Sequence, residues 1–73
     1  MTSPFLIRAL VSFCHGRCFP SAEPIVEAFP EVRAASVRDA LKRAIEMGWI
    51  VGTVHRTRNP DGEVTAIRNI RGL

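Results

Sequence analysis

The sequence lacks a long uninterrupted apolar run. Its most apolar stretch, residues 5–13, is interrupted by Arg8 and has no basic segment before it. A helix needs about 20 apolar residues to cross a bilayer, and a secretory leader begins with positive charge. The sequence therefore predicts neither a membrane span nor a targeting segment, and we expect a cytoplasmic protein.

Cysteine is also scarce, since Cys14 and Cys18 are the only two in the chain. Two thiols in a cytosolic chain are normally reduced, and a cysteine of this kind often fills core space. The alternative is a metal site in which Cys14, His15 and Cys18 act together with His55. Zinc sites usually need a second closely spaced ligand pair, which this sequence does not contain. We therefore expect no metal and no other cofactor.

The residue patterns that carry enzyme chemistry are missing as well. The seven acidic residues are spread thinly, and no glycine-rich loop precedes a helical segment. Catalysis needs paired carboxylates, a nucleophile beside a base, or a phosphate loop. Cys14 and His15 are sequence neighbours, but adjacency does not provide reactive geometry, and a positive side chain suits a helix end at His15. The sequence thus predicts a protein that is not an enzyme and has no small-molecule substrate.

What the chain does contain is enough apolar sequence for one core. It has 73 residues, 47% of them hydrophobic, so residues 1–73 are expected to form a single domain. Its charge is distributed unevenly: residues 1–31 carry a net −1, residues 32–58 carry +4, and residues 59–73 carry zero. A basic middle segment is expected of a phosphate-binding surface, although a charged run is also typical of a solvated helix face.

The first helix is predicted over residues 3–15. Ser3 followed by Pro4 is a favourable start, because a hydroxyl can cap free amides and proline fits the first turn, and Gly16 ends the helix. The expected core face consists of Phe5, Leu6, Ala9, Leu10 and Phe13. Residues 17–19 are too few for a helix and can form a short extra strand.

The second helix is predicted over residues 21–29. Ser21 is its expected cap, Glu23 lies in its first turn where the helix dipole favours an anion, and Pro30 stops it. At about two turns, this helix is short.

The third helix is predicted over residues 36–47. Ser36 and Asp39 have the spacing of a capping box, and Gly48 is the expected left-handed stop. The apolar face consists of Val37, Ala40, Leu41, Ala44 and Ile45. The polar face consists of Arg38, Asp39, Lys42, Arg43 and Glu46.

A β-hairpin is predicted over residues 49–70. Residues 49–55 are rich in branched and aromatic side chains, as strands are, and residues 59–62 read Asn-Pro-Asp-Gly, a strong turn signal. Trp49 is expected to anchor the core beneath the hairpin, and His55 to point outward.

The order of these elements has a specific use. Helices over 21–29 and 36–47, joined by a short connection, form a helix-turn-helix whose second member presents its polar face to the major groove. The hairpin over 55–62 then reaches the backbone or the minor groove. The residues expected to contact DNA are Arg33, Ser36, Arg38, Asp39, Lys42, Arg43, Arg56, Arg58 and Asn59. The sequence thus predicts a sequence-selective double-stranded DNA-binding protein, such as a small transcriptional regulator.

Residues 36–50, SVRDALKRAIEMGWI, resemble the recognition helix of bacterial winged-helix regulators of the GntR-like and MarR-like groups. In these groups a Val-Arg-x-Ala-Leu pattern leads to a glycine and an apolar pair that starts the wing. The turn at 59–62 is similar to their wing tip, and residues 19–21 to the entry of their second helix. Over residues 17–70, the resemblance implies an α+β winged helix-turn-helix with three helices, a two-stranded hairpin wing and DNA binding.

The chain departs from that pattern at Ala34, Ala35 and Asp39, where the family commonly has polar or basic residues. The Asp39 carboxylate can accept a hydrogen bond from cytosine N4 but repels phosphate. As a capping residue it also has a structural reason to be there. Backbone binding is therefore better supported than base readout.

A winged helix can alternatively bind a protein instead of DNA. A DNA binder would present one continuous positive face over the third helix and the hairpin, whereas a protein module would present an exposed apolar patch there. The basic segment at 32–58 favours DNA.

The first helix carries a second apolar stripe, formed by Ile7, Val11 and Cys14. A helix that is apolar nearly all round is normally buried on more than one side. We therefore expect a homodimer joined through this stripe, which would match two recognition helices to two half-sites. The alternative is that the stripe packs under the last strand, around Ile67 and Ile70.

Overall fold

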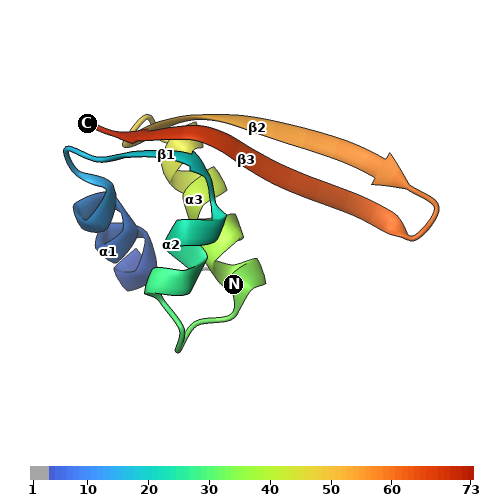
Figure 1. Ribbon diagram of the computed structural model, residues 1–73, viewed down its shortest axis with the longest axis horizontal. Helices are drawn as coiled ribbons and strands as arrows, with labels where there is room; N and C mark the ends of the chain where they lie inside the picture. Colours follow the sequence, from blue (N-terminus) through green and yellow to red (C-terminus); the bar gives the residue numbers. More distant parts are fainter. Residues whose placement is uncertain (1–3) are drawn as a thin grey trace.

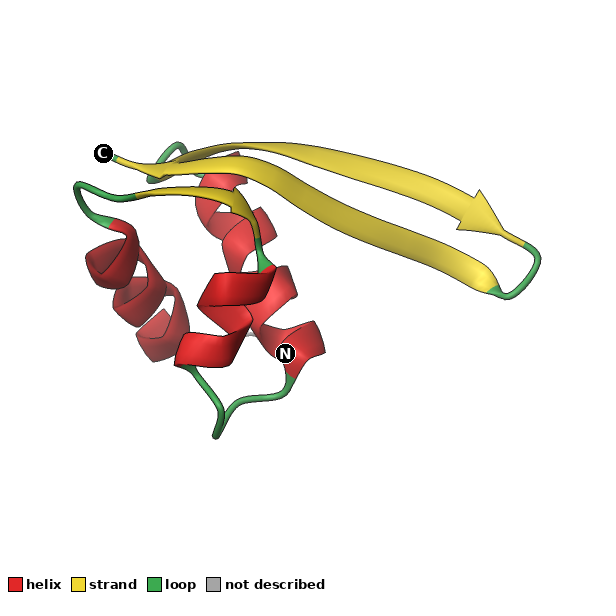
Figure 2. Cartoon of the chain, viewed as in Figure 1, coloured by secondary structure: helices red, strands yellow, loops and turns green. Residues whose placement is uncertain are grey.

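The computed structural model describes residues 4–73, and the side chains of all of these except residues 63–65. It is an α+β structure with three helices and a three-stranded antiparallel sheet (Figure 1). The elements are α1 (Pro4–Cys14), β1 (Cys18–Ser21), α2 (Glu23–Ala28), α3 (Ala34–Glu46), β2 (Ile50–Asn59) and β3 (Gly62–Gly72). The helices lie on one side of the sheet, and most of the β2–β3 hairpin extends beyond them (Figure 2).

Glycines end the two longer helices as predicted. Gly16 follows α1 with a φ of 69°, and Gly48 follows α3 with a φ of 79°. These left-handed backbone conformations suit glycine because it has no Cβ. The predicted cap at Ser3 lies outside the described residues. Among residues 4–73, no helix is long and apolar enough to cross a membrane.

The predicted start of the second helix was wrong. Ser21 is the last residue of β1 and pairs with Arg68 of β3. The helix begins at Glu23 instead, and its capping position is Ala22, whose side chain has no hydrogen-bonding group. Strand pairing therefore overrides the local capping preference of the serine.

The predicted capping box of the third helix was also wrong. α3 begins two residues earlier, at Ala34, with Arg33 as the extended residue before it and no side-chain cap. The Val37 amide already donates an intrahelical hydrogen bond to the Arg33 carbonyl, at 3.0 Å. Ser36 thus lies inside the first turn, where its hydroxyl cannot cap the helix.

The sheet has the strand order β1-β3-β2, with β3 in the centre. The short strand expected near 17–19 is confirmed, displaced by one or two residues to Cys18–Ser21. The turn at 59–62 is confirmed too, since Asn59 pairs with Gly62 across a two-residue connection. The hairpin is longer than predicted because β3 continues to Gly72, where it can pair with both other strands.

A bulge in β3 lies at the base of the hairpin. Val51 pairs with Arg71 and Thr53 with Arg68, so β3 has one more residue than β2 between these pairs. Asn69, within the bulge, has a φ of 54°. Bulges bend a strand and increase its twist. We call the hairpin beyond this point, residues 54–67, the arm.

The core lies between the helices and the inner face of the sheet. Almost every element contributes a fully buried aliphatic side chain: Leu10 from α1, Ile25 from α2, Leu41 from α3, Ile50 from β2 and Ile70 from β3. Burying one such side chain stabilises the fold by roughly 1.5–3 kcal/mol. This packing fixes the angle between α3 and the sheet.

The predicted core face of the first helix is confirmed at Leu6, Leu10 and Phe13 but was wrong at Phe5 and Ala9, which are exposed. Ile7 is 7% exposed and Cys14 is fully buried, whereas Phe5 is 79% exposed. The stripe expected at a dimer contact therefore faces the core. Ile7 and Cys14 belong to the same buried cluster as Ile67 and Ile70. This is the alternative in which the stripe packs under the last strand.

Helical spacing explains the error, because α1 has two apolar stripes and spacing alone cannot say which neighbour each will meet. Val11, the third member of the stripe, is half-buried. The homodimer itself stays a prediction, but Ile7 and Cys14 are not available as its contacts.

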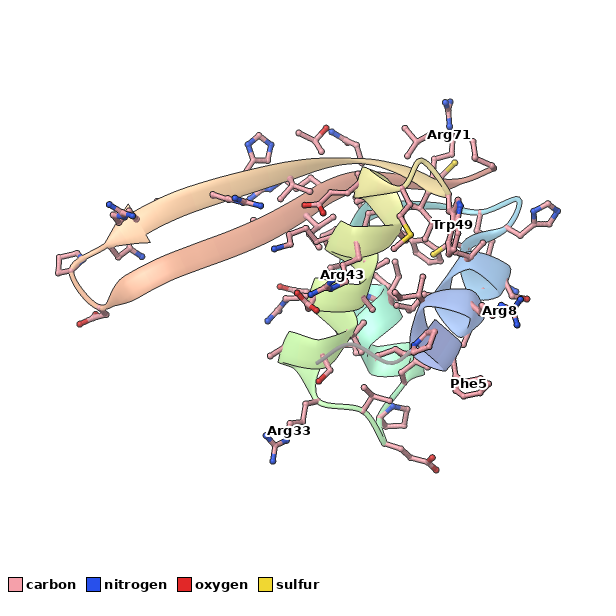
Figure 3. All side chains as sticks on the ribbon, turned by 180° about the vertical axis from the view of Figure 1, so that it is seen from behind. Phe5, Arg8, Arg33, Arg43, Trp49 and Arg71 are labelled. Carbon is pink, nitrogen blue, oxygen red and sulfur yellow. The ribbon has the colours of Figure 1, made fainter. Side chains whose placement is uncertain are left out.

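Trp49 does not anchor the core as predicted, since it is 46% exposed. It lies in the turn between α3 and β2, and its side chain borders a shallow groove with Arg8, Val11 and Ser12 of α1 (Figure 3). The next residue, Ile50, is buried instead. Trp49 lies before the first strand pair, Ile50 with Gly72, so the sheet register fixes Ile50 inward but does not fix Trp49.

Gly72 is the glycine with the least space around it. A methyl group added there would overlap the Cys14 carbonyl and come within 2.7 Å of the His15 amide nitrogen. Gly72 also donates a hydrogen bond to the Arg17 carbonyl, at 3.1 Å. Because these neighbours are backbone atoms, we expect Gly72→Ala to lower the free energy of unfolding by about 3 kcal/mol in urea titrations, the upper end for overpacking.

Gly52→Ala is the matched control for this prediction. Its new methyl group would meet mainly the end of the flexible Ile45 side chain, at 2.8 Å. We expect a loss of about 0.5 kcal/mol or less. Equal losses in the two variants would contradict the close approach of β3 to the end of α1.

Candidate nucleic-acid interface

The polar face of α3 points away from the core. Val37, Ala40, Leu41 and Ala44 are buried on the inner face, as predicted from their spacing. On the outer face Arg38, Arg43 and Glu46 are exposed, and Asp39 and Lys42 are half-buried. The third helix therefore presents three cationic side chains to its surroundings from one continuous surface.

Asp39 has a different structural role from the one predicted. Its carboxylate accepts a hydrogen bond from Arg43 Nε at 3.1 Å, one helical turn further on. Such exposed pairs contribute only about 0.3–0.5 kcal/mol to stability. The pair does, however, hold the Arg43 guanidinium along the helix, which leaves Arg38 and Lys42 as the cations of α3 without an ion pair among the described side chains.

The arm carries its arginines on the side that faces α3. Ile50 and Val54 point toward the core side of the sheet, and the same alternation continues to Arg56 and Arg58. Beyond the core, none of the three described helices lies beneath this face of the arm (Figure 1). His55 lies on the opposite face and is exposed, as predicted.

An ion pair joins the base of the arm to α3. Arg56 Nη2 lies 3.8 Å from Glu46 Oε1, and both side chains are more than half exposed. This contact shows that the arginine face of the arm looks toward the C-terminal end of α3. The outer face of α3 with Arg38 and Lys42 and the arginine face of the arm thus lie on the same side of the sheet.

The remaining predicted contacts are placed less favourably. Arg33 is exposed at the N-terminal end of α3, far from the arm (Figure 3). Ser36 is half-buried. Asn59 ends β2 on the face opposite to Arg58 by strand alternation. The structure places Arg38 and Lys42 on the outer face of α3, and Arg56 and Arg58 on the side of the arm that faces α3.

Arg68 is a cation near Arg38 that sequence reasoning missed, and its pairing with Thr53 places it on the outer face of the sheet. It lies on β3 and borders the same crevice as Arg38 of α3. The sequence hid it because residues 59–73 have no net charge, with Asp61 and Glu63 near the hairpin tip. Only the pairing of Ser21 with Arg68 brings it beside the helices.

The two cysteine thiols differ from each other in burial. Cys14 is buried, and burial raises the pKa of its thiol more than the nearby Arg17 charge lowers it, so the thiol is protonated at neutral pH. Cys18 is exposed at the start of β1. In the part of the chain that the structure describes, no three His, Cys, Asp or Glu side chains gather in a way that could hold a metal ion.

Comparisons of the chain with family models, with curated proteins and with solved structures found no match.

Proposed function

We propose that this chain is a winged helix-turn-helix protein that binds double-stranded DNA sequence-selectively and acts as a small transcriptional regulator. In this proposal α3 enters the major groove and the arm lies along the neighbouring backbone or minor groove. The element order supports it: a helix, a short strand, two helices and a hairpin, with β1 joined to the hairpin through β3. The resemblance of residues 36–50 to recognition helices implies the same arrangement.

The observation that carries the proposal is that α3 and the arm both present cations on the same side of the sheet. Arg38 and Lys42 come from α3, while Arg56 and Arg58 come from the facing side of the arm. An α-helix about 10–12 Å across fits the B-DNA major groove, which is about 12 Å wide. Cations on both sides of such a helix are suited to contact the phosphates that border the groove.

The exposure of the arm also supports DNA binding. Every residue from 55 to 62 is exposed. A two-stranded hairpin on its own is only marginally stable in water, and this part of the arm buries none of these side chains in the core. Its arginines therefore serve a contact outside the chain better than they serve the fold.

A protein-binding module would need an apolar patch at this surface instead. Among the described side chains, the large exposed hydrophobic ones are Phe5, Met47, Trp49, Val51 and Leu73. None of them lies within α3 or between residues 54 and 62. The distribution of exposed apolar area thus supports DNA over a protein partner for the α3–arm surface.

The test is the salt dependence of duplex binding. Each neutralised phosphate contributes about −0.9 to the slope of log affinity against log salt concentration. With three to six phosphate contacts, we expect a slope of about −3 to −5 for a random duplex, measured by fluorescence anisotropy. Selection of bound sequences from a random library should then enrich a common motif. A slope near zero, or no binding at low salt, would refute the proposal.

A further inference from the structure

A crevice of about 460 Å³ opens where the arm leaves the body. Its walls are residues 20–23 between β1 and α2, Arg38 of α3, and residues 66–68 of β3. The sheet itself creates this opening. Ser21 and Arg68 form the last pair between β1 and β3, after which the chain turns away into α2 and leaves the edge of β3 uncovered.

Two arginines from elements that are distant in sequence border this crevice. Arg38 and Arg68 are both exposed, and neither takes part in the two ion pairs formed by the described side chains. Arginine presents a planar fork of donors that matches phosphate oxygens, and it carries its charge at any physiological pH. Ser21, on the same wall, adds a half-buried hydroxyl. The donor set is therefore that of a phosphate site.

The charge balance favours a phosphate with a single negative charge. Glu23 also borders the crevice, so the two arginines and this carboxylate give the site a net charge of +1. One phosphodiester of a nucleic-acid backbone neutralises that charge. A free phosphate dianion would leave excess negative charge beside Glu23, which disfavours it.

We propose that this crevice binds one backbone phosphate of the duplex strand beside α3, with Arg38 and Arg68 as its two charged donors. This inference rests on the proposed DNA binding and adds to it a contact from the body of the protein, near the helix and distinct from the arm. Such a contact fixes the depth and angle at which α3 enters the groove, because phosphate contacts set position whereas base contacts set sequence.

The experiment compares Arg68→Gln with Arg71→Gln. The two arginines lie on the same strand and, through their pairing with Thr53 and Val51, on the same outer face of the sheet (Figure 3 labels Arg71), but Arg68 borders the crevice and Arg71 does not. We expect Arg68→Gln to weaken duplex binding about tenfold, equally for all sequences, and to make the salt slope less negative by about 0.9. Arg71→Gln should stay within about twofold of the wild type.

Glu23→Gln is expected to change duplex affinity in the opposite direction, and this test needs no variant of Arg68. Removing its carboxylate should strengthen duplex binding about threefold, since a close negative charge opposes the phosphate. Arg68→Lys keeps the charge and should retain the wild-type slope even if Arg68→Gln folds poorly. Inorganic phosphate should compete no better than chloride at equal ionic strength.

These outcomes distinguish failure of the proposed DNA binding from failure of the crevice as a phosphate site. A wild type that fails to bind duplex DNA overturns the proposed function and this site with it. A wild type that binds with the expected slope, while Arg68→Gln behaves like Arg71→Gln and Glu23→Gln brings no gain, overturns the crevice alone.

Discussion

Replacing Arg38 and Lys42 together by alanine should weaken duplex binding about 100-fold and leave the thermal unfolding midpoint nearly unchanged. Both side chains lie on the outer face of α3 and form no ion pair among the described residues. Hydrogen bonds to charged groups contribute about 1.5–3 kcal/mol each, and about 2.8 kcal/mol corresponds to a factor of 100. Fluorescence anisotropy gives the affinity, and circular dichroism gives the midpoint.

The control for this variant removes two arginines elsewhere. Arg8→Ala combined with Arg71→Ala causes the same change in net charge, but Arg8 lies on the outer side of α1 and Arg71 on the outer face of the sheet (Figure 3). We expect a loss of about threefold or less, from long-range electrostatics alone. If both double variants lose affinity equally, net charge drives the binding, and the proposed direct contact between α3 and the duplex is contradicted.

Leu41→Ala should destabilise the protein by about 2–5 kcal/mol. Leu41 has no exposed surface and lies on the inner face of α3, where it belongs to the cluster shared with α1 and the sheet. Truncation leaves a cavity that close-packed neighbours fill only in part. A domain of this size has a total stability near the low end of about 5–15 kcal/mol, so the variant should be partly unfolded at 37 °C. Urea titrations at that temperature, extrapolated to zero urea, measure its free energy of unfolding.

Met47→Ala is the matched control, since it also removes a long apolar side chain. Met47 follows α3 directly but is 49% exposed. Its loss should change the free energy of unfolding by about 0.5 kcal/mol or less. Comparable losses in the two variants would contradict the orientation of α3 against the sheet, and with it the position of the candidate interface.

Sequence patterns with one dominant local cause predicted the structure well. The stops at Gly16 and Gly48 follow from a backbone conformation that glycine tolerates, and the turn at 59–62 from residues with strong turn preference. The two faces of α3 follow from its marked amphipathicity, with apolar residues at helical spacing on one side and charges on the other. These features let the sequence predict the helix and the hairpin from which the candidate interface is built.

Patterns with two competing causes were predicted wrongly. Ser21 and Ser36 are good caps in isolation, but pairing with β3 places the first in a strand, and an earlier helix start places the second inside a turn. Trp49 and Ile50 are both apolar, but β2 begins at Ile50, and only Ile50 is held inward by the sheet. At Ser21, pairing with a strand distant in sequence exceeds a local capping preference of about 1 kcal/mol.

By itself, then, the sequence determined the order of helices and strands, the ends of the longer helices, the hairpin turn and the cationic face of α3, because each depends on residues close along the chain. Only the tertiary structure decided which stripe of α1 is buried and which arginines share a surface. Ile7 and Cys14 are in the core because the end of β3 passes beside α1. Arg68 borders the crevice with Arg38 because the sheet register places it there, and register depends on strands about 50 residues apart.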